Sequence, residues 1–244
     1  MSVLLLRLCG PMQSWGVQSR FSVRDTGLEP SKSGVVGLLC AALGRPRTAP
    51  LDDLASLRMG VRVDVEGRLA YDFHTAQNVL KAGGGLKDTE PSRRYYLADA
   101  RFLVGLAGED EALLQRLAAA LRNPVWPLYL GRKSFVPSDP PWLPDGLRRA
   151  TSLESAFQAY PWLGPVDANP PERIRMVVED ANGSEVRPDQ PISFAERRFV
   201  LRRVTTRFLT GCDLPRHFQS QRCGDLSRPI SRSIGSFQAV LETH

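Results

Sequence analysis

The stretch Ser2-Val-Leu-Leu-Leu-Arg-Leu-Cys9 begins the chain with an almost unbroken apolar run, and Gly10-Pro11 follows it directly. An apolar run of this length that ends at glycine and proline predicts a buried strand. It is too short to cross a bilayer, as is the next apolar run, Val35 to Leu43, which Gly37 interrupts. The first residues also lack the pattern of a signal peptide. We therefore expect a soluble, cytoplasmic protein with no membrane partner, whose core includes this first strand.

The segments that follow the first strand predict an α+β fold. A helix is expected from Ser31 to Gly44, because serine caps helix N-termini and glycine ends helices. Residues 61–65 alternate apolar and charged side chains and turn through Glu66-Gly67 into residues 68–74, which predicts a hairpin. The remaining predicted elements of this part are a strand at 100–106, a helix at 109–121 and a short strand at 126–130. This order of strands and helices is typical of the ferredoxin-like fold, which RNA recognition modules use.

Two further regions depart from that pattern. Residues 75–95 have no apolar periodicity and contain Gly83-Gly84-Gly85, so we expect a projecting loop or hairpin arm there. Prolines are frequent between residues 137 and 171, which predicts an irregular connection. Beyond it, alternating segments at 174–179, 197–208 and 236–242 predict strands of a smaller β-rich unit. The sequence thus favours a ferredoxin-like unit over residues 1–136, with an insertion at about 75–95, and a β-rich C-terminal unit over residues 137–244.

The charge distribution favours a polyanionic partner. The net charge is +6, and the stretch from residue 190 to residue 235, with nine arginines against three acidic residues, alone accounts for it. Arginine suits bidentate phosphate contacts and stacking on bases, although a genome biased toward arginine codons would also raise its share. The four cysteines form no Cys-x-x-Cys pair, which is typical of reduced thiols. Cys212, His217 and Cys223 lack a nearby fourth ligand for zinc, so we expect ordinary loop residues and no metal or other cofactor.

Several stretches resemble, in family order, the CRISPR-associated Cas-five family and, within it, the CasD branch of type I-E Cascade. They cover about the first 140 residues: Gly10-Pro-Met-Gln-Ser-Trp-Gly16, Ser19-Arg-Phe21, Pro30-Ser-Lys-Ser-Gly34, Asp72-Phe-His-Thr75, Tyr96-Leu-Ala-Asp-Ala100 and Trp126-Pro-Leu-Tyr-Leu-Gly-Arg-Lys-Ser134. The resemblance implies a ferredoxin-like palm, a β-hairpin thumb and a grip on the 5′ handle of the CRISPR guide RNA. It also implies partners: the guide RNA, the backbone subunits of Cascade, and the large subunit that recognises target DNA.

The residues that we expect to contact RNA combine cations, hydroxyls, amides and aromatic rings in four tracts. They are Gln13, Ser14, Trp15, Arg20 and Arg24; Ser31, Lys32 and Ser33; His74, Thr75, Lys81, Lys87, Arg93 and Arg94; and Arg132, Lys133 and Ser134. Three alternatives remain open. Trp15 could stack on a base or plug the core, and Ser31 or Ser33 could simply cap the helix while Lys32 binds phosphate at its N-terminus. The arm could also be a solvated loop without a partner.

A catalytic alternative concerns Tyr71, His74 and Lys81, because related type I-C subunits cut RNA with a tyrosine, a histidine and a lysine. Such cleavage needs one group to deprotonate the 2′-hydroxyl and another to protonate the leaving oxygen. Tyr71 and His74 are an odd number of positions apart, so on a regular strand they point to opposite faces. We therefore expect no enzyme, with a metal-independent endoribonuclease for CRISPR repeat RNA as the alternative. A third hypothesis is a structural adaptor whose basic surface contacts target DNA more than RNA.

Overall fold

The computed structural model describes residues 1–18 and 22–215. Its elements, in chain order, are β1 (Ser2–Cys9), β2 (Met12–Gln13), β3 (Val23–Arg24), α1 (Lys32–Leu43), α2 (Asp52–Ala55), β4 (Arg58–Val65), β5 (Arg68–Leu80), β6 (Leu86–Ala98), β7 (Arg101–Gly108), α3 (Glu111–Arg122), β8 (Trp142–Arg148), α4 (Leu153–Ala159), β9 (Arg173–Glu179), β10 (Glu185–Ser193), β11 (Arg198–Thr210) and a short 3₁₀ turn (Gly211–Asp213). The predicted strand at 236–242 and the predicted RNA contact Arg20 lie outside the described residues. The mixed α+β class is confirmed.

The apolar run at the start of the chain lies inside a seven-stranded sheet of order β10-β11-β9-β4-β7-β1-β8, whose neighbours are all antiparallel. Strand β1 pairs with β7 on one side and β8 on the other. Because successive side chains of a strand point to opposite faces, Leu4 and Leu6 join the core on one face and Val3 and Leu5 the core on the other. This is why the run is apolar at nearly every position.

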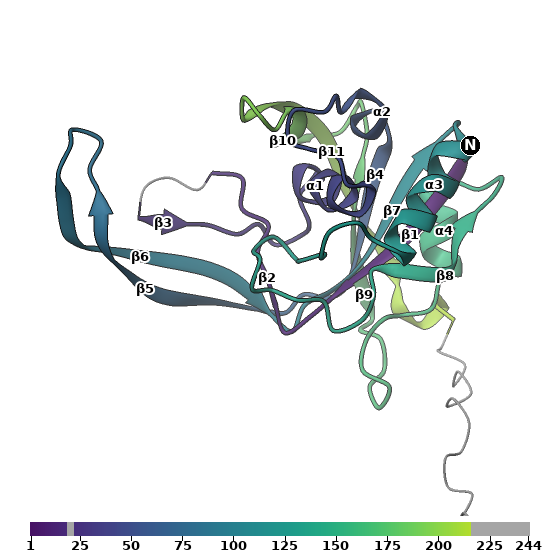
Figure 1. Cartoon of the computed structure of the whole chain (residues 1–244). Coiled ribbons are helices and arrows are strands. Elements are labelled where there is room, and N and C mark those ends of the chain that lie inside the picture. Colours follow the sequence, from purple (N-terminus) through teal and green to yellow (C-terminus); the bar gives the residue numbers. More distant parts are fainter. Residues whose placement is uncertain (19–21, 216–244) are drawn as a thin grey trace, which may run out of the picture.

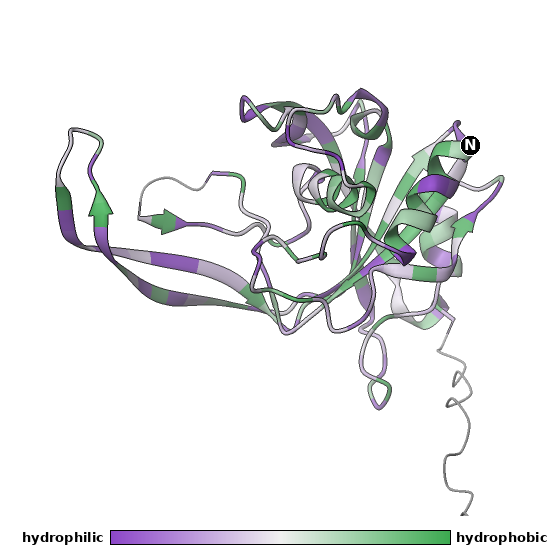
Figure 2. Ribbon diagram, viewed as in Figure 1, coloured by the Kyte–Doolittle hydropathy of each residue, from purple (hydrophilic) through white to green (hydrophobic). Residues whose placement is uncertain are grey.

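Helices cover both faces of the sheet and make three layers (Figure 1). The apolar sides of α1 and α3 pack on the face that Leu4 and Leu6 share, and α4 packs on the other. Gly60 in β4 and Gly105 in β7 admit α4 closely, since an added Cβ would lie 2.8 Å from the Phe157 ring and 2.7 Å from the Leu153 side chain, respectively. Apolar residues concentrate between these layers (Figure 2).

A long hairpin of β5 and β6 projects from the sheet (Figure 1). Its ladder runs from the pair Arg68↔Ala98 at the root to the pair Leu80↔Leu86 near the tip. On the other edge of β6, β2 pairs with residues 97–98 and β3 pairs in parallel with residues 93–94. The loop that carries β3 therefore lies alongside the hairpin. Most of the arm is exposed and hydrophilic, whereas Leu80 and Leu86 place apolar side chains in solvent at its tip (Figure 2).

Two sequence expectations about individual strands are corrected. The segment 126–130 forms no strand, because the backbone N–H groups of Val125 and Trp126 donate to the carbonyls of Ala42 and Ala41 at the end of α1. Strand β8 occupies the position beside β1 instead. The expected hairpin of residues 61–74 is also wrong: β4 pairs with β7 and β9, while β5 pairs with β6. Alternating side chains identify a strand without identifying its partner.

The expected division into a palm and a separate β-rich C-terminal unit at residues 136–137 also changes. Strand β9 pairs with β4, β11 pairs with β9, and β10 pairs with β11, so these strands extend the sheet that begins with β1. Strand β10 was not predicted, because Pro188 and Pro191 break its pattern. Within the described residues, the C-terminal strands thus share one sheet with the N-terminal part. This shared sheet also places them next to the loop between β1 and α1.

Candidate nucleic-acid interface

Two residues predicted to contact RNA at the start of this loop are core residues. Trp15 is 2% exposed and belongs to the main hydrophobic cluster, so the core plug is the correct alternative. Gln13 is 0% exposed, and its side-chain amide donates to the carbonyls of Leu8 (3.1 Å) and Ala100 (2.7 Å). Its amide oxygen accepts from the indole N–H of Trp15 at 3.3 Å. Neither side chain offers a surface to a base.

The Ser-Lys-Ser tract at the start of α1 is a structural cap. Lys32 is 1% exposed, and its Nζ lies 2.9 and 3.1 Å from the two carboxylate oxygens of Glu179 on β9. Burial lowers the pKa of Lys32, and the charge of Glu179 opposes that change. The Ser31 hydroxyl accepts from the backbone N–H of Gly34, and Ser33 donates to Ser31. The predicted phosphate contact of Lys32 is therefore wrong, because a carboxylate already holds the ammonium group away from solvent.

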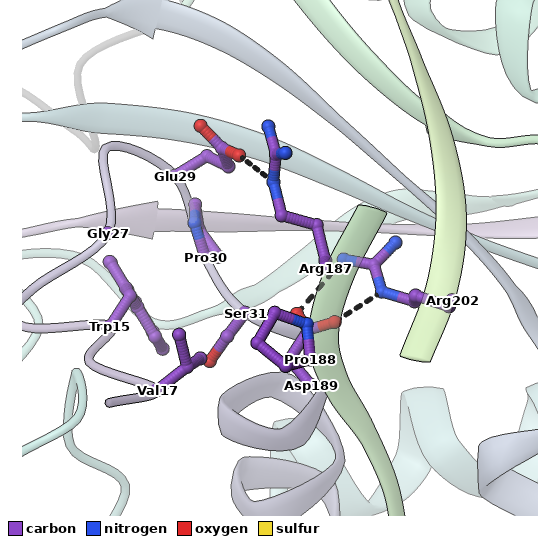
Figure 3. A pocket seen from close by; sticks show the side chains of 10 residues that line it. All are labelled: Trp15, Val17, Gly27, Glu29, Pro30, Ser31, Arg187, Pro188, Asp189 and Arg202. Carbon is purple, nitrogen blue, oxygen red and sulfur yellow. Dashed lines mark hydrogen bonds and ion pairs between the residues drawn. The ribbon is translucent and has the colours of Figure 1, made fainter. Parts of the chain in front are cut away.

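A small hollow lies between this loop and strands β10 and β11 (Figure 3). Its volume is about 60 Å³, and Trp15, Arg187 and Asp189 are among its lining residues. The side chain of Arg202 donates to both carboxylate oxygens of Asp189, at 2.7 and 3.0 Å. A space of this size holds a few water molecules and is too small for a nucleotide. The hollow belongs to the joint that fastens the loop to the sheet.

The structure does bring together three of the predicted arginines, Arg24, Arg94 and Arg132, which we name the arginine cluster. Arg24 and Arg94 are directly opposite in the parallel pair of β3 and β6. Arg132 follows Gly131 in the loop after α3, and its Nη2 donates to the carbonyl of Tyr95 at 2.7 Å. The three residues line a polar hollow of about 390 Å³, together with Ser14, Gly16, Asp25 and Gly131. Three distant tracts of the sequence therefore converge on one open site.

The electrostatics of the arginine cluster favour an anionic ligand. Within residues 1–18 and 22–215, none of the three guanidinium groups forms an ion pair. Burial lowers the pKa of Arg132, and the charges of Arg94 and Arg24 lower it further, against Asp72 and Asp25. Its buried Nη1 has no hydrogen-bond partner. Like charges directly opposite on neighbouring strands repel, and a phosphate would relieve this repulsion through charge-assisted hydrogen bonds.

The other predicted residues are distributed along the arm and beside the cluster. His74 is exposed, and its Nε2 lies 3.7 Å from the Asp72 carboxylate on the same strand. Lys87 pairs with Glu90 near the tip. The remaining predicted contacts that are exposed are Thr75, Lys81, Arg93, Lys133 and Ser134. The Ser14 hydroxyl is buried and donates to the carbonyls of Asp25 and Tyr95, at 3.4 and 3.3 Å.

The arm also has an apolar face, which was not predicted from the sequence. Leu69 and Phe73 are 59% and 64% exposed, and Tyr71, which was considered only as a catalytic group, is 57% exposed. Their spacing of two residues puts all three on one face of β5. The register places Arg94 opposite Asp72, and therefore on the other face of the hairpin. The period-two pattern of the three side chains was visible in the sequence, but such a pattern is usually a sign of burial.

A family model described as CRISPR-associated protein (Cas_Cas5) matches residues 3–205. The chain belongs to the Cas5 family of CRISPR-associated proteins. This Cas5 chain is 35% identical over 178 residues to the CRISPR system Cascade subunit CasD of Escherichia coli (strain K12), across 67% of the chain and 79% of CasD. The family predicted from the Gly10–Gly16 motif and its companions is thus confirmed, together with its CasD branch.

Solved structures agree with this assignment. The chain superposes with a TM-score of 0.74 on a crystal structure of a Cas protein that is 48% identical, covering 88% of this chain and 98% of that one. It superposes with a TM-score of 0.70 on a 36% identical chain from a CRISPR RNA-guided surveillance complex, covering 85% of this chain and 90% of that one. The similarity therefore extends beyond the N-terminal stretches that carried the sequence resemblance.

Neither a membrane span nor a metal site is found in the described part of the Cas5 chain. No helix there has the length and apolar character that crossing a bilayer requires. No group of three or more histidine, cysteine, aspartate or glutamate side chains there could hold a metal ion. Of the tract considered for zinc, Cys212 is exposed, while His217 and Cys223 lie outside the described residues.

Proposed function

We propose that this Cas5 chain is a non-catalytic guide-RNA-binding subunit of a cytoplasmic type I-E interference complex. It grips the 5′ handle of the guide RNA and caps the backbone subunits next to the subunit that recognises target DNA. The observation that carries the proposal is the projecting β5–β6 hairpin with the arginine cluster at its side. Similarity to the CasD subunit of Cascade and to a chain of an RNA-guided surveillance complex supports it.

Within this proposal, strands β4, β7, β1 and β8, with helices α1 and α3, form a ferredoxin-like palm. Their spatial order, β4-β7-β1-β8, has the first and third strands in the centre, as in that fold. The β5–β6 hairpin is inserted between the second and third palm strands and forms the thumb. Strands β9, β10 and β11 extend the palm sheet beyond β4.

The chemistry of binding follows from the arginine cluster. Guanidinium groups contact phosphate oxygens with two parallel hydrogen bonds, so three of them around one hollow can hold the backbone of a single strand in a fixed path. Arg93, Lys81 and Lys87 supply further cations along the thumb. These contacts read charge and shape, and they fix the position of the RNA without selecting a sequence.

Shortening the thumb tests the proposed grip. Replacing residues 77–87 by a tight turn removes residues that lie outside the core clusters and that are exposed except for the half-buried Val79. The free energy of unfolding should therefore change by only about 0.5 kcal/mol. The shortened protein should retain the guide RNA poorly, or assemble a complex that fails to capture target DNA. A variant with Lys81→Gln and Lys87→Gln keeps the length of the arm but removes two of its positive charges. Comparing it with the shortened protein separates the effect of length from the effect of charge. Normal assembly and target capture by the shortened protein would make the thumb a passive loop.

The geometry of the thumb also bears on the catalytic alternative. Tyr71 pairs with Tyr95 and His74 with Ser92 in an unbroken ladder, so the two side chains lie on opposite faces of the hairpin. Lys81 lies seven residues beyond His74, which corresponds to roughly 23 Å along a strand. The three groups cannot meet one 2′-hydroxyl and its leaving oxygen in this arrangement. This supports the non-catalytic proposal over the endoribonuclease.

His74→Ala provides a direct test of that choice. Processing of repeat RNA in the reconstituted system should proceed at the parental rate, because another subunit makes the cut in this proposal. The purified parental chain, incubated with repeat RNA and EDTA, should leave the RNA intact. A loss of processing by an H74A complex that assembles normally would establish the endoribonuclease instead.

A further inference from the structure

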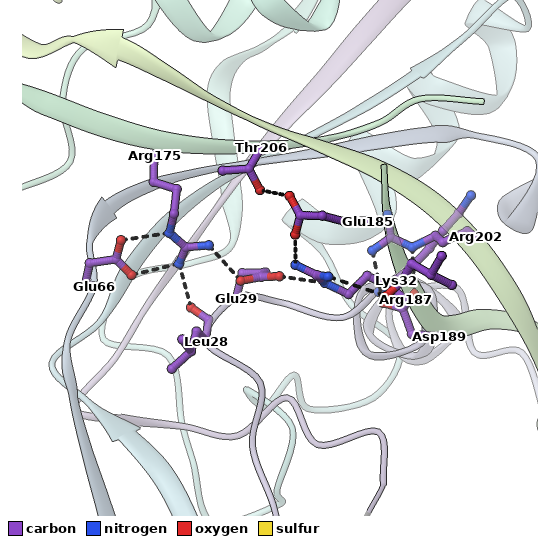
Figure 4. Close-up of polar contacts among 11 residues, drawn as sticks. Leu28, Glu29, Lys32, Glu66, Arg175, Glu185, Arg187, Asp189, Arg202 and Thr206 are labelled. Atoms are coloured by element: carbon purple, nitrogen blue, oxygen red, sulfur yellow. Dashed lines mark hydrogen bonds and ion pairs between the residues drawn. The ribbon is translucent and has the colours of Figure 1, made fainter. Parts of the chain in front are cut away.

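Arg175 on β9 connects two segments that both lead to the arginine cluster (Figure 4). Its Nε and Nη2 donate to the two carboxylate oxygens of Glu66, at 2.9 and 2.7 Å. Its Nη1 donates to Glu29 at 2.8 Å, and its Nη2 also donates to the carbonyl of Leu28 at 3.3 Å. Glu66 lies in the turn between β4 and the thumb, and Glu29 lies where the β3 loop returns to α1. We name Arg175, Glu29 and Glu66 the Arg175 clasp.

The Arg175 clasp is partly withdrawn from water and supported by a second arginine. Arg175 is 18% exposed and Glu29 is 13% exposed. Arg187 on β10 donates to the other oxygen of Glu29 at 3.1 Å and to Glu185 at 3.0 Å. The pKa of Arg175 is raised, first by its hydrogen bonds to Glu66. Ion pairs in such a shielded network are stronger and geometrically better defined than isolated surface pairs.

The β3 loop meets the thumb through a small set of local contacts. The backbone N–H of Arg93 donates to the carbonyl of Ser22 at 2.8 Å, and the Ser14 hydroxyl joins the carbonyls of Asp25 and Tyr95. The regular pairing of the loop with β6 comprises two residue pairs, Val23↔Arg93 and Arg24↔Arg94. Because these contacts are few, the spacing of Arg24 and Arg94 depends also on how the loop and the thumb leave the body of the protein. One guanidinium group holds both departure points, through Glu29 for the loop and Glu66 for the thumb.

We propose that Arg175 is a positioning residue for RNA binding: it fixes the β3 loop relative to the root of the thumb and thereby sets the spacing of the arginine cluster. This inference rests on the proposed RNA-binding function and assigns the C-terminal strands a task in it. Binding groups hold their ligand well only when a surrounding set of contacts locks their geometry. Arg175 supplies that lock from the opposite end of the sequence without contacting the RNA.

The test compares Arg175→Met with Arg45→Met in the full chain. Arg45 is a matched control, because it also makes two hydrogen bonds to one carboxylate, that of Asp53, with 22% of its side chain exposed. Its pair lies beyond the C-terminal end of α1, whereas the clasp lies at the N-terminal end. The probe is labelled single-stranded RNA with the handle sequence read from guide RNA that copurifies with the complex. Affinity, its salt dependence and the melting temperature are measured for each variant.

We expect R175M to bind the probe about tenfold more weakly than R45M at a similar melting temperature, the effect typical of removing a supporting group. The salt dependence should stay parental, because every cation that meets a phosphate is still present. Equal affinity of the two variants would overturn the inference, and so would a slope lowered by about 0.7, which would mean that Arg175 contacts a phosphate itself.

Two further variants keep this test decisive. If R175M does not fold, Glu66→Gln replaces it, because Glu66 is 57% exposed and its substitution leaves Arg175 paired with Glu29. E66Q should then weaken binding, and parental affinity would overturn the inference. Arg94→Gln serves as a reference for the interface: if R94Q weakens binding and the clasp variants do not, only the positioning role fails. If R94Q has no effect either, the proposed RNA interface itself is wrong.

Discussion

Replacing Arg62 by methionine is expected to destabilise the Cas5 chain by about 3–5 kcal/mol, the cost of removing one partner of a buried ion pair. Arg62 on β4 and Asp64 are both fully buried, and two hydrogen bonds of 2.6 and 2.7 Å join them. Arg62 also donates to the carbonyls of Phe157, Tyr160 and Pro161. The substitution would leave a buried carboxylate without this cation and three carbonyls without this donor. The expected change is a large part of the stability of an ordinary domain.

Urea unfolding measures this effect, with Arg58→Met as the control. Arg58 lies on the same strand, but its side chain is 34% exposed. The side chain of Glu154, with which it forms an ion pair, is 28% exposed. R58M should therefore cost only about 1 kcal/mol. The double variant Arg62→Met, Asp64→Leu should recover part of the stability, because both buried charges are then removed. A change below about 1 kcal/mol for R62M would contradict the role given to this pair.

Changing Arg24, Arg94 and Arg132 together to glutamine is expected to weaken guide-RNA binding on the order of a hundredfold, since each charged hydrogen-bond donor to phosphate contributes appreciably. The matched control changes Arg116, Arg122 and Arg149 to glutamine. These three are exposed and lie on α3 and just after β8, on the side of the sheet away from the thumb (Figure 1). Both variants remove three positive charges from the chain. In the control, Arg149 also loses its ion pair with Glu111 and Arg122 its contact with the Trp142 ring, so the melting temperature of both variants is measured beside affinity. Equal affinities of the two variants would assign binding to net charge alone.

The spacing of apolar residues, and the residues that begin or end helices and strands, predicted the elements that depend on local sequence. The first strand, α1 from its serine cap, and α3 from the acidic run at residues 109–111 all follow from neighbouring residues. Strand partners depended on distant residues and were less predictable. Residues 126–130 have a strand-like composition, yet the backbone N–H of Trp126 donates to the end of α1 and that of Leu130 to the carbonyl of Phe135. Nothing within that segment shows this competition.

The residues of the candidate site show the same contrast between what local sequence predicts and what depends on distant residues. A lysine between two serines at a helix N-terminus has the composition of a phosphate site, and only the structure shows that Glu179, 147 positions away, already holds it. Trp15 and Gln13 were selected for side-chain chemistry, whereas their burial depends on the whole fold. Each member of the arginine cluster was selected from its own tract. Their convergence requires the β3–β6 pairing and the path of the loop after α3, neither of which has a local signal.

The salt dependence of guide-RNA affinity tests the central proposal most directly. A plot of the logarithm of affinity against the logarithm of salt concentration has a slope that falls by about 0.7 for each phosphate of a single strand that the protein no longer neutralises. For the variant of Arg24, Arg94 and Arg132 we predict a slope about 2 units smaller than that of the parent, and for the variant of Arg116, Arg122 and Arg149 an unchanged slope. A parental slope in the first variant would show that the arginine cluster does not bind the RNA backbone, and would contradict the account.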